Sequence, residues 1–157
     1  KVRKMSFILF HSYFPALAEK ETRTITVLPD ANLDLPWGEY AFLEMYCDEQ
    51  GCDCRRVIYS VVFSKTKKIE AVISYGWESP SFYSKWMRSS DPHVISAIKG
   101  ACLNIGSYQS KLAPAILELF KKTLVNDSKY MDRVKRHYEL FRDAVERQRD
   151  SAHPRNN

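Results

Sequence analysis

The sequence predicts an α+β domain in which an antiparallel sheet of about four strands, drawn from the N-terminal half, is packed by C-terminal helices. Three observations support this class. Runs rich in β-branched and aromatic residues come first, helix-start signals follow Trp77, and two long amphipathic patterns end the chain. A length of 157 residues suits one domain. We expect that domain to span residues 1–150, followed by a flexible polar tail over 151–157.

The predicted strands are short runs bounded by turn residues. In chain order they are Thr22–Leu28, Glu39–Cys47, Cys54–Ser64 and Lys68–Trp77. The first alternates polar and apolar residues and stops at Pro29, as a half-buried strand does. Only Lys65-Thr66-Lys67 separates the last two runs, which predicts a hairpin. The segment before Pro15 is expected to pack on the core as a helix or a strand.

The predicted helices begin after Trp77. Ser79 before Pro80 and Asp91 before Pro92 each pair a capping side chain with proline at the first helical position. Gly100 is expected to end the second of these helices. Two longer amphipathic helices are predicted over about 111–125 and 128–149. Because the link between them is short, we expect them to pack antiparallel as a helical hairpin.

Composition and charge limit the function classes. A net charge of +5 is small, and the last predicted helix mixes acids with its bases, which is typical of a solvated face. Nucleic-acid binding through that basic helix is therefore only an alternative. The sequence contains no run of about 18 apolar residues, so it predicts no membrane-spanning helix. The apolar N-terminal stretch is broken by His11, Ser12 and Pro15, unlike an export signal, so the sequence favours a cytoplasmic location.

Three cysteines form the most informative cluster. Cys47, Cys52 and Cys54 lie between two predicted strands, which brings their thiols to one sheet edge. Side chains two residues apart share a strand face, and Gly51 permits a tight return of the chain. Zinc prefers four tetrahedral ligands, including thiolates, so the cluster predicts most of a structural zinc site. Arg55 and Arg56 are placed to offset its negative charge.

Zinc needs a fourth ligand beyond the three thiolates. His137 is our candidate, because it lies on or beside the apolar face of the last helix, where an imidazole needs a polar partner. A core histidine bonded to a backbone carbonyl is the other interpretation of His137. His11, Cys102 and water are the remaining candidates for the ligand. Free buried thiols, or a disulfide such as Cys47 with Cys52, are alternatives to the metal itself.

An aromatic segment follows the last predicted strand. It runs from Tyr75 to Trp86 and includes Trp77, Glu78 and Tyr83. A strand-to-helix turn of this kind supplies flat stacking surfaces, so Trp77, Glu78, Tyr83 and Trp86 form a candidate ligand or partner surface. Packing of these rings in the core is the plainer interpretation. A single carboxylate without a paired base or nucleophile is weak support for catalysis.

Three stretches carry a resemblance to known proteins. Tyr46-Cys-Asp-Glu-Gln-Gly-Cys-Asp-Cys-Arg-Arg-Val57 and Tyr75-Gly-Trp-Glu-Ser-Pro80, together with Arg136-His-Tyr138, resemble a group of uncharacterised bacterial proteins. The resemblance spans most of the chain and implies no activity.

The sequence leaves three functional hypotheses. The first is a zinc-stabilised binding or scaffold module with a protein partner, and the second is a hydrolase that uses an open position on the same metal. The third is nucleic-acid binding. No catalytic motif decides whether the chain is an enzyme.

Overall fold

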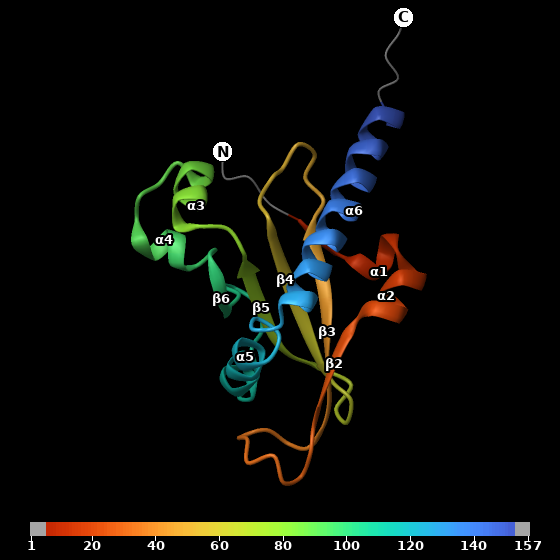
Figure 1. Ribbon diagram of the computed structural model, residues 1–157, viewed down its shortest axis with the longest axis vertical. Helices are drawn as coiled ribbons and strands as arrows, with labels where there is room; N and C mark the ends of the chain where they lie inside the picture. The colour runs from red at the N-terminus through yellow and green to blue at the C-terminus, as the bar shows by residue number, and fades with distance from the viewer. Residues whose placement is uncertain (1–5, 153–157) are drawn as a thin grey trace, which may run out of the picture.

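The computed structural model describes residues 6–152 and has the predicted α+β architecture. Its strands are β1 (Phe7–Leu9), β2 (Arg23–Val27), β3 (Gly38–Cys47), β4 (Arg56–Phe63), β5 (Ile69–Gly76) and β6 (Gly100–Leu103). Its helices are α1 (Phe10–Tyr13), α2 (Pro15–Glu21), α3 (Pro80–Met87), α4 (Pro92–Ser96), α5 (Ala113–Lys122) and α6 (Ser128–Ala152). Strands dominate the first half of the chain and helices the second (Figure 1).

The strands form one antiparallel sheet in the order β1-β3-β4-β5-β6. The long strand β3 also pairs with β2, so two short strands share its outer edge. Phe7 of β1 lies opposite Cys47, whereas Arg23 of β2 lies opposite Phe42. The chain leaves this edge between β1 and β2 to form α1 and α2, which pack beside β3.

The expectation of about four strands was too low, since the sheet has six. The four predicted strands are β2 to β5, and the two that were missed are β1, with three residues, and β6, with four. Runs this short do not complete an alternating pattern, so local sequence does not distinguish them from loops. Gly100 was expected to end a helix, but that helix ends at Ser96 and Gly100 begins β6.

Two of the predicted helix starts are confirmed. Ser79 caps α3 by accepting a hydrogen bond from the Phe82 N–H at 3.1 Å. Asp91 caps α4 by accepting one from the His93 N–H at 2.9 Å. In both helices proline occupies the first turn, where its missing N–H leaves no hydrogen bond unmade.

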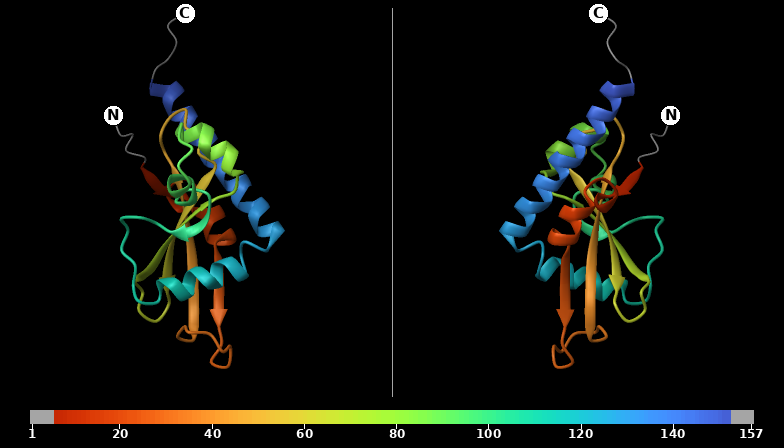
Figure 2. Two further views of the ribbon diagram at one scale, coloured as in Figure 1. Left: turned by 90° about the vertical axis from the view of Figure 1, so that its left-hand side faces the viewer. Right: turned by 90° about the vertical axis from the view of Figure 1, so that its right-hand side faces the viewer.

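The expected antiparallel hairpin of the two last helices is not formed. Figures 1 and 2 show α5 crossing the sheet while α6 rises away from it at a steep angle. The buried residues of both helices belong to one core cluster together with residues of β3, β4 and β5, so each helix packs its apolar face against the sheet. Of the predicted tail, Ser151 and Ala152 belong to α6, and residues 153–157 lie outside the described residues.

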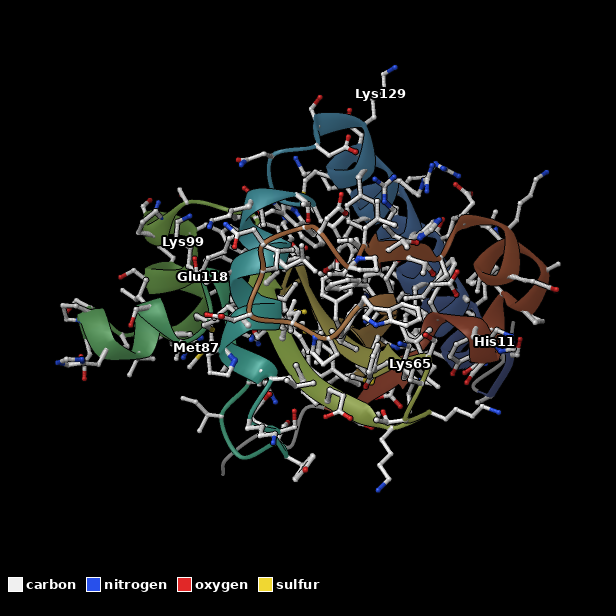
Figure 3. The ribbon with its side chains drawn as sticks, turned by 90° about the horizontal axis from the view of Figure 1, so that it is seen from below. His11, Lys65, Met87, Lys99, Glu118 and Lys129 are labelled. Carbon is white, nitrogen blue, oxygen red and sulfur yellow. The ribbon has the colours of Figure 1, made fainter. Side chains whose placement is uncertain are left out.

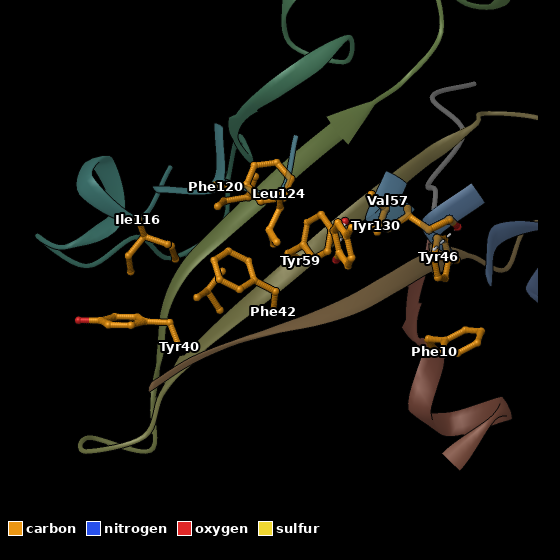
Figure 4. Close-up of a cluster of buried hydrophobic side chains, with 14 of the residues drawn as sticks. Phe10, Tyr40, Phe42, Tyr46, Val57, Tyr59, Ile116, Phe120, Leu124 and Tyr130 are labelled. Carbon is orange, nitrogen blue, oxygen red and sulfur yellow. Dashed lines mark hydrogen bonds between the residues drawn. The ribbon is translucent and has the colours of Figure 1, made fainter. Parts of the chain in front are cut away.

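The core lies between the sheet and the helices α5 and α6 (Figure 4). Alternate residues of β4, including Val57 and Tyr59, point to this side and are fully buried. Phe120 of α5 stacks its ring among three others, with centroids 5.9 Å from Phe42 and 5.0 Å from Tyr59. Within the described residues, no helix is both long and apolar enough to cross a membrane.

The core predicts a large cost for truncating Phe120, which is fully buried. We expect Phe120→Ala to lower the free energy of unfolding by about 3–5 kcal/mol, because it removes a large apolar side chain and leaves a cavity. Urea denaturation measures the change. Ile105→Ala is the control, since Ile105 is 79% exposed and its loss should change stability by less than about 0.5 kcal/mol. Equal effects of the two variants would contradict this packing.

A charged cluster fixes α2 to α6. The Glu21 carboxylate, at the end of α2, lies 2.8 Å from Arg136 Nη2 and 3.2 Å from Arg133 Nε. The Arg136 hydrogen bond is the largest influence on the pKa of Glu21 and lowers it from its usual value of 4.5. A carboxyl whose pKa is lower in the folded state stabilises the fold above its usual pKa and loses that effect as the pH falls through its folded pKa.

We therefore expect Glu21→Gln to lower stability near neutral pH, and the difference from the natural chain to shrink as the pH falls from about 6 to about 3. Thermal unfolding across this range measures the difference. Glu118→Gln is the matched control, because Glu118 is exposed on α5 and lies 3.4 Å from Lys121 (Figure 3). A difference between Glu21→Gln and the natural chain that stays constant with pH would refute the role of this ion pair.

Candidate metal centre

The three clustered cysteines meet where β3 ends. Cys47 is the last residue of β3, and Cys52 and Cys54 lie in the loop before β4, beside α6 (Figure 1). Their sulfur atoms all lie within 4.8 Å of one another. Cys47 and Cys54 are fully buried, whereas Cys52 is partly exposed. All three are free thiols, so the disulfide alternative is not what the structure contains.

The loop between Cys47 and Cys54 is shaped by a short turn. Gly51 adopts a φ of 71°, a left-handed conformation that glycine reaches without strain. The Cys52 N–H donates to the Glu49 carbonyl at 3.3 Å, which closes the turn. Outside the loop, Glu146 of α6 accepts a hydrogen bond from the Gly51 N–H at 2.6 Å. The turn therefore returns Cys52 toward Cys47 and is fastened to the last helix.

Two tyrosines fix the exit from the loop at Arg55. Arg55 has a φ of 48°, which is unusual for a residue with a side chain. Its N–H donates to the Tyr138 hydroxyl at 3.1 Å, and its carbonyl accepts from the Tyr83 hydroxyl at 2.8 Å. Both backbone groups are thus satisfied by side chains from α3 and α6, which hold Cys54 in place for the start of β4.

Donor groups surround the sulfurs and their loop. The Glu49 N–H donates to Cys47 Sγ at 3.4 Å. Arg142 of α6, which is almost fully buried, donates to the carbonyls of Cys47 at 2.6 Å and Glu49 at 2.7 Å. Arg56 is buried as well. Of the two arginines expected to offset the cluster's charge, Arg56 lies inside, whereas Arg55 pairs with Asp53 at 2.9 Å.

The thiols influence one another strongly. Hydrogen bonds from Cys47 and Cys54 to the Cys52 sulfur lower the pKa of Cys52, and Arg142 adds to this effect. The pKa of Cys54 is raised, first by its hydrogen bond with Cys47 and further by burial. A bound cation would displace the protons that these neighbouring sulfurs share.

The spacing fits a tetrahedral metal. Zinc–sulfur bonds of about 2.3 Å place two sulfurs of one tetrahedron about 3.8 Å apart. Sulfurs within 4.8 Å of one another therefore need only small rotamer adjustments to share one ion. The structure thus shows a cysteine triad close enough to bind a metal.

His137 contacts residues other than the three cysteines. Its side chain is fully buried, and its Nδ1 lies 2.8 Å from Glu44 Oε1. Its Nε2 makes no hydrogen bond and lies 3.5 Å from Glu21 Oε1. The imidazole also stacks on the Phe10 ring with centroids 4.3 Å apart. The structure thus brings together Cys47, Cys52 and Cys54 without His137, and the role of His137 as fourth ligand stays a prediction.

The other candidate ligands also lie outside the triad. Cys102, on β6, donates its thiol hydrogen to the Ala97 carbonyl at 3.3 Å. His11 is exposed on α1 at the edge of the molecule (Figure 3).

The aromatic segment is only partly buried. Tyr83 is fully buried, whereas Trp77, Glu78 and Trp86 are partly exposed. Trp86 meets Tyr83 edge-to-face at 6.5 Å, and Trp77 meets Tyr138 edge-to-face at 5.2 Å. Glu78 lies 3.5 Å from Arg55, so Tyr83 and Glu78 both contact the exit of the cysteine loop. The role of these four residues as a ligand or partner surface stays a prediction.

Three basic residues of α6 contact other parts of the chain. Arg133 and Arg136 contact Glu21, and Arg142 contacts the cysteine loop. Lys129, Lys135 and Arg147 are exposed, so nucleic-acid binding through this helix stays an untested alternative.

A variant of His137 separates its two interpretations. If His137 serves mainly as a hydrogen-bond partner of Glu44, His137→Leu will remove one of the two side chains that contact the buried Glu44 carboxyl, the other being Tyr46. It will then lower the free energy of unfolding by about 1–3 kcal/mol without changing how much zinc the chain binds. Urea denaturation and metal analysis measure the two effects. His93→Leu is the control, because His93 is exposed on α4. Loss of the metal from a stably folded His137→Leu variant would instead identify a ligand.

No known protein provides a template for this site. Comparisons with protein-family models, with curated proteins and with solved structures found no match. The geometry of the cysteine triad is consequently the basis of the functional proposal.

Proposed function

We propose that this protein is a zinc-binding module in which Cys47, Cys52 and Cys54 hold one structural ion. The observation that carries the proposal is the approach of three sulfur atoms to within 4.8 Å. Contacts among three neighbouring thiols, two of them buried, add little stability to the fold. The same three thiols bind a soft cation strongly. The zinc ion supplies the positive charge that this cluster of sulfurs needs.

The bound ion would help to hold α6 against the sheet. Its ligands come from the end of β3 and from the loop before β4. That loop is bound to α6 through Glu146 and Arg142. Fixing the sulfurs therefore fixes the position of α6 against the sheet, and with it a surface for a protein partner.

Zinc is our choice of metal because three thiolates at one site suit a soft, redox-inactive ion. Free thiols favour a reducing compartment, which supports our proposal of a cytoplasmic location.

A metal-dependent hydrolase is the second candidate function. Three protein sulfurs leave one position of a tetrahedral ion for water, as catalytic zinc sites do. The partial exposure of Cys52 gives solvent a route to that position. Azide added to the cobalt-substituted chain distinguishes the two functions, because only an open position lets it change the visible spectrum.

Metal analysis of the purified chain tests the proposal. We expect about one zinc per chain, and we expect Cys47→Ser, Cys52→Ser and Cys54→Ser each to reduce zinc content at least about tenfold and to lower thermal stability. Removing zinc from the natural chain with a chelator should lower its stability in the same way.

Cys102→Ser is the matched control, because Cys102 is the one cysteine outside the triad. This variant should bind as much zinc as the natural chain. A purified chain without metal, whose four thiols react equally fast with a thiol reagent, would overturn the proposal.

A further inference from the structure

A cavity opens on the face of the sheet that α5 and α6 leave uncovered. Its volume is about 390 Å³, and residues of four strands and of the segment after β6 line it. Figure 2 shows that segment on the side of the sheet away from α6. The lining residues are Phe7, Met45, Arg56, Ile58, Val72, Asn104 and Ser107. Its size lies at the lower end of small-molecule sites, which begin at about 300 Å³.

Arg56 is the only charged residue in this lining, and it is 4% exposed. Its Nε donates to the Ile98 carbonyl at 3.2 Å, and its Nη2 donates to the Ser74 hydroxyl. Both acceptors are neutral, and no carboxylate among residues 6–152 pairs with this guanidinium. Neither contact places an anionic oxygen on the guanidinium, although the Cys54 and Cys47 sulfurs are near enough to interact with its charge. A carboxylate in the cavity would therefore gain a direct, charge-assisted hydrogen bond from Arg56.

The guanidinium keeps donors free for such an anion. Nη1 has no hydrogen-bond partner within the described part of the chain, although Nε and Nη2 are engaged. The Ser107 hydroxyl accepts a hydrogen bond from Asn104 Nδ2 at 2.7 Å and so keeps its own hydrogen to donate. Arg56 and Ser107 therefore both line the cavity with unused donors.

Four of the other lining residues are apolar, and Asn104 is polar. Phe7, Met45, Ile58 and Val72 come from four neighbouring strands and offer no charged group. The Arg56 guanidinium carbon lies 6.0 Å from the centre of the Phe7 ring. A fully hydrated inorganic anion would leave this wall unused, whereas an organic acid would cover it.

The segment over the cavity is fastened in place. Gln109 accepts a hydrogen bond from the Val72 N–H at 2.9 Å and donates one to the Val72 carbonyl at 2.8 Å. Its side chain thus pairs with β5 as a further strand would. Binding would require no large rearrangement, because this side of the cavity already has its hydrogen bonds made.

From this geometry we propose that the cavity binds a small organic carboxylate, with its carboxylate on Arg56 and Ser107 and its apolar part against Phe7, Met45, Ile58 and Val72. A planar guanidinium matches a carboxylate in shape and charge, which favours it over an alcohol or an amine. None of the cavity residues belongs to the cysteine triad, although β3 contributes to both sites.

Calorimetric titration of the purified 157-residue chain with hexanoate tests the proposal. We expect saturable binding with a dissociation constant of about 1 mM, which suits a ligand of so few atoms. Hexanol and hexylamine keep the apolar part but lack the anion, and each should bind at least about tenfold more weakly. Phosphate should also bind weakly, because it cannot cover the apolar wall.

Two variants act on the cavity in different ways. Arg56→Met removes the charge. Ser107→Trp fills the cavity from the segment after β6 and changes no residue of the sheet, so it tests the proposal even if Arg56→Met folds poorly. Each should weaken hexanoate binding at least about tenfold, whereas Arg147→Met, at an exposed site on α6, should not change it. Equal affinity for hexanoate and hexanol, binding unaffected by Ser107→Trp, or no saturable binding would each overturn the proposal.

Discussion

The mutual approach of three cysteine sulfurs is the constraint on which the rest of this structure depends. Sulfurs within 4.8 Å are close enough for one metal ion, and they come from the end of β3 and from the loop before β4. Two tyrosines hold Arg55 in an unusual conformation, and Arg142 and Glu146 fasten the loop to α6. Much of the hydrogen bonding at this end of the fold therefore positions these thiols.

Buried charge follows a different pattern on each face of the sheet. On the helix side, His137 lies between Glu44 and Glu21, so the charges have partners within the chain. On the opposite face, Arg56 has only neutral acceptors. The first arrangement is explained by stability alone, whereas the second leaves Arg56 without a direct anionic hydrogen-bond acceptor and supports our proposal of a ligand there. This contrast separates a structural ion pair from a candidate binding site.

The sequence predicted what depends on local pattern. The strands β2 to β5, the caps at Ser79 and Asp91 and the meeting of the three cysteines all follow from spacings within a few residues. The short strands β1 and β6 exist only because longer strands pair with them, so no local signal announces them. The angle between α5 and α6 likewise depends on the sheet that both helices cover.

Contacts distant along the chain account for the rest of the candidate site. The sequence placed His137 correctly on a buried helix face, but its partner, Glu44, is 93 residues away and carries no local sign of the contact. The same holds for Tyr83 and Tyr138, whose hydroxyls meet the backbone of Arg55. Arg142 was indistinguishable from a solvated surface residue, because only the tertiary structure buries it.

X-ray absorption at the zinc edge, on the natural chain as purified, tests the central claim most directly. The account predicts three sulfur neighbours at about 2.3 Å and one lighter atom in a tetrahedral shell. A zinc ion with fewer than three sulfur neighbours, or bound only by oxygen and nitrogen, would contradict it.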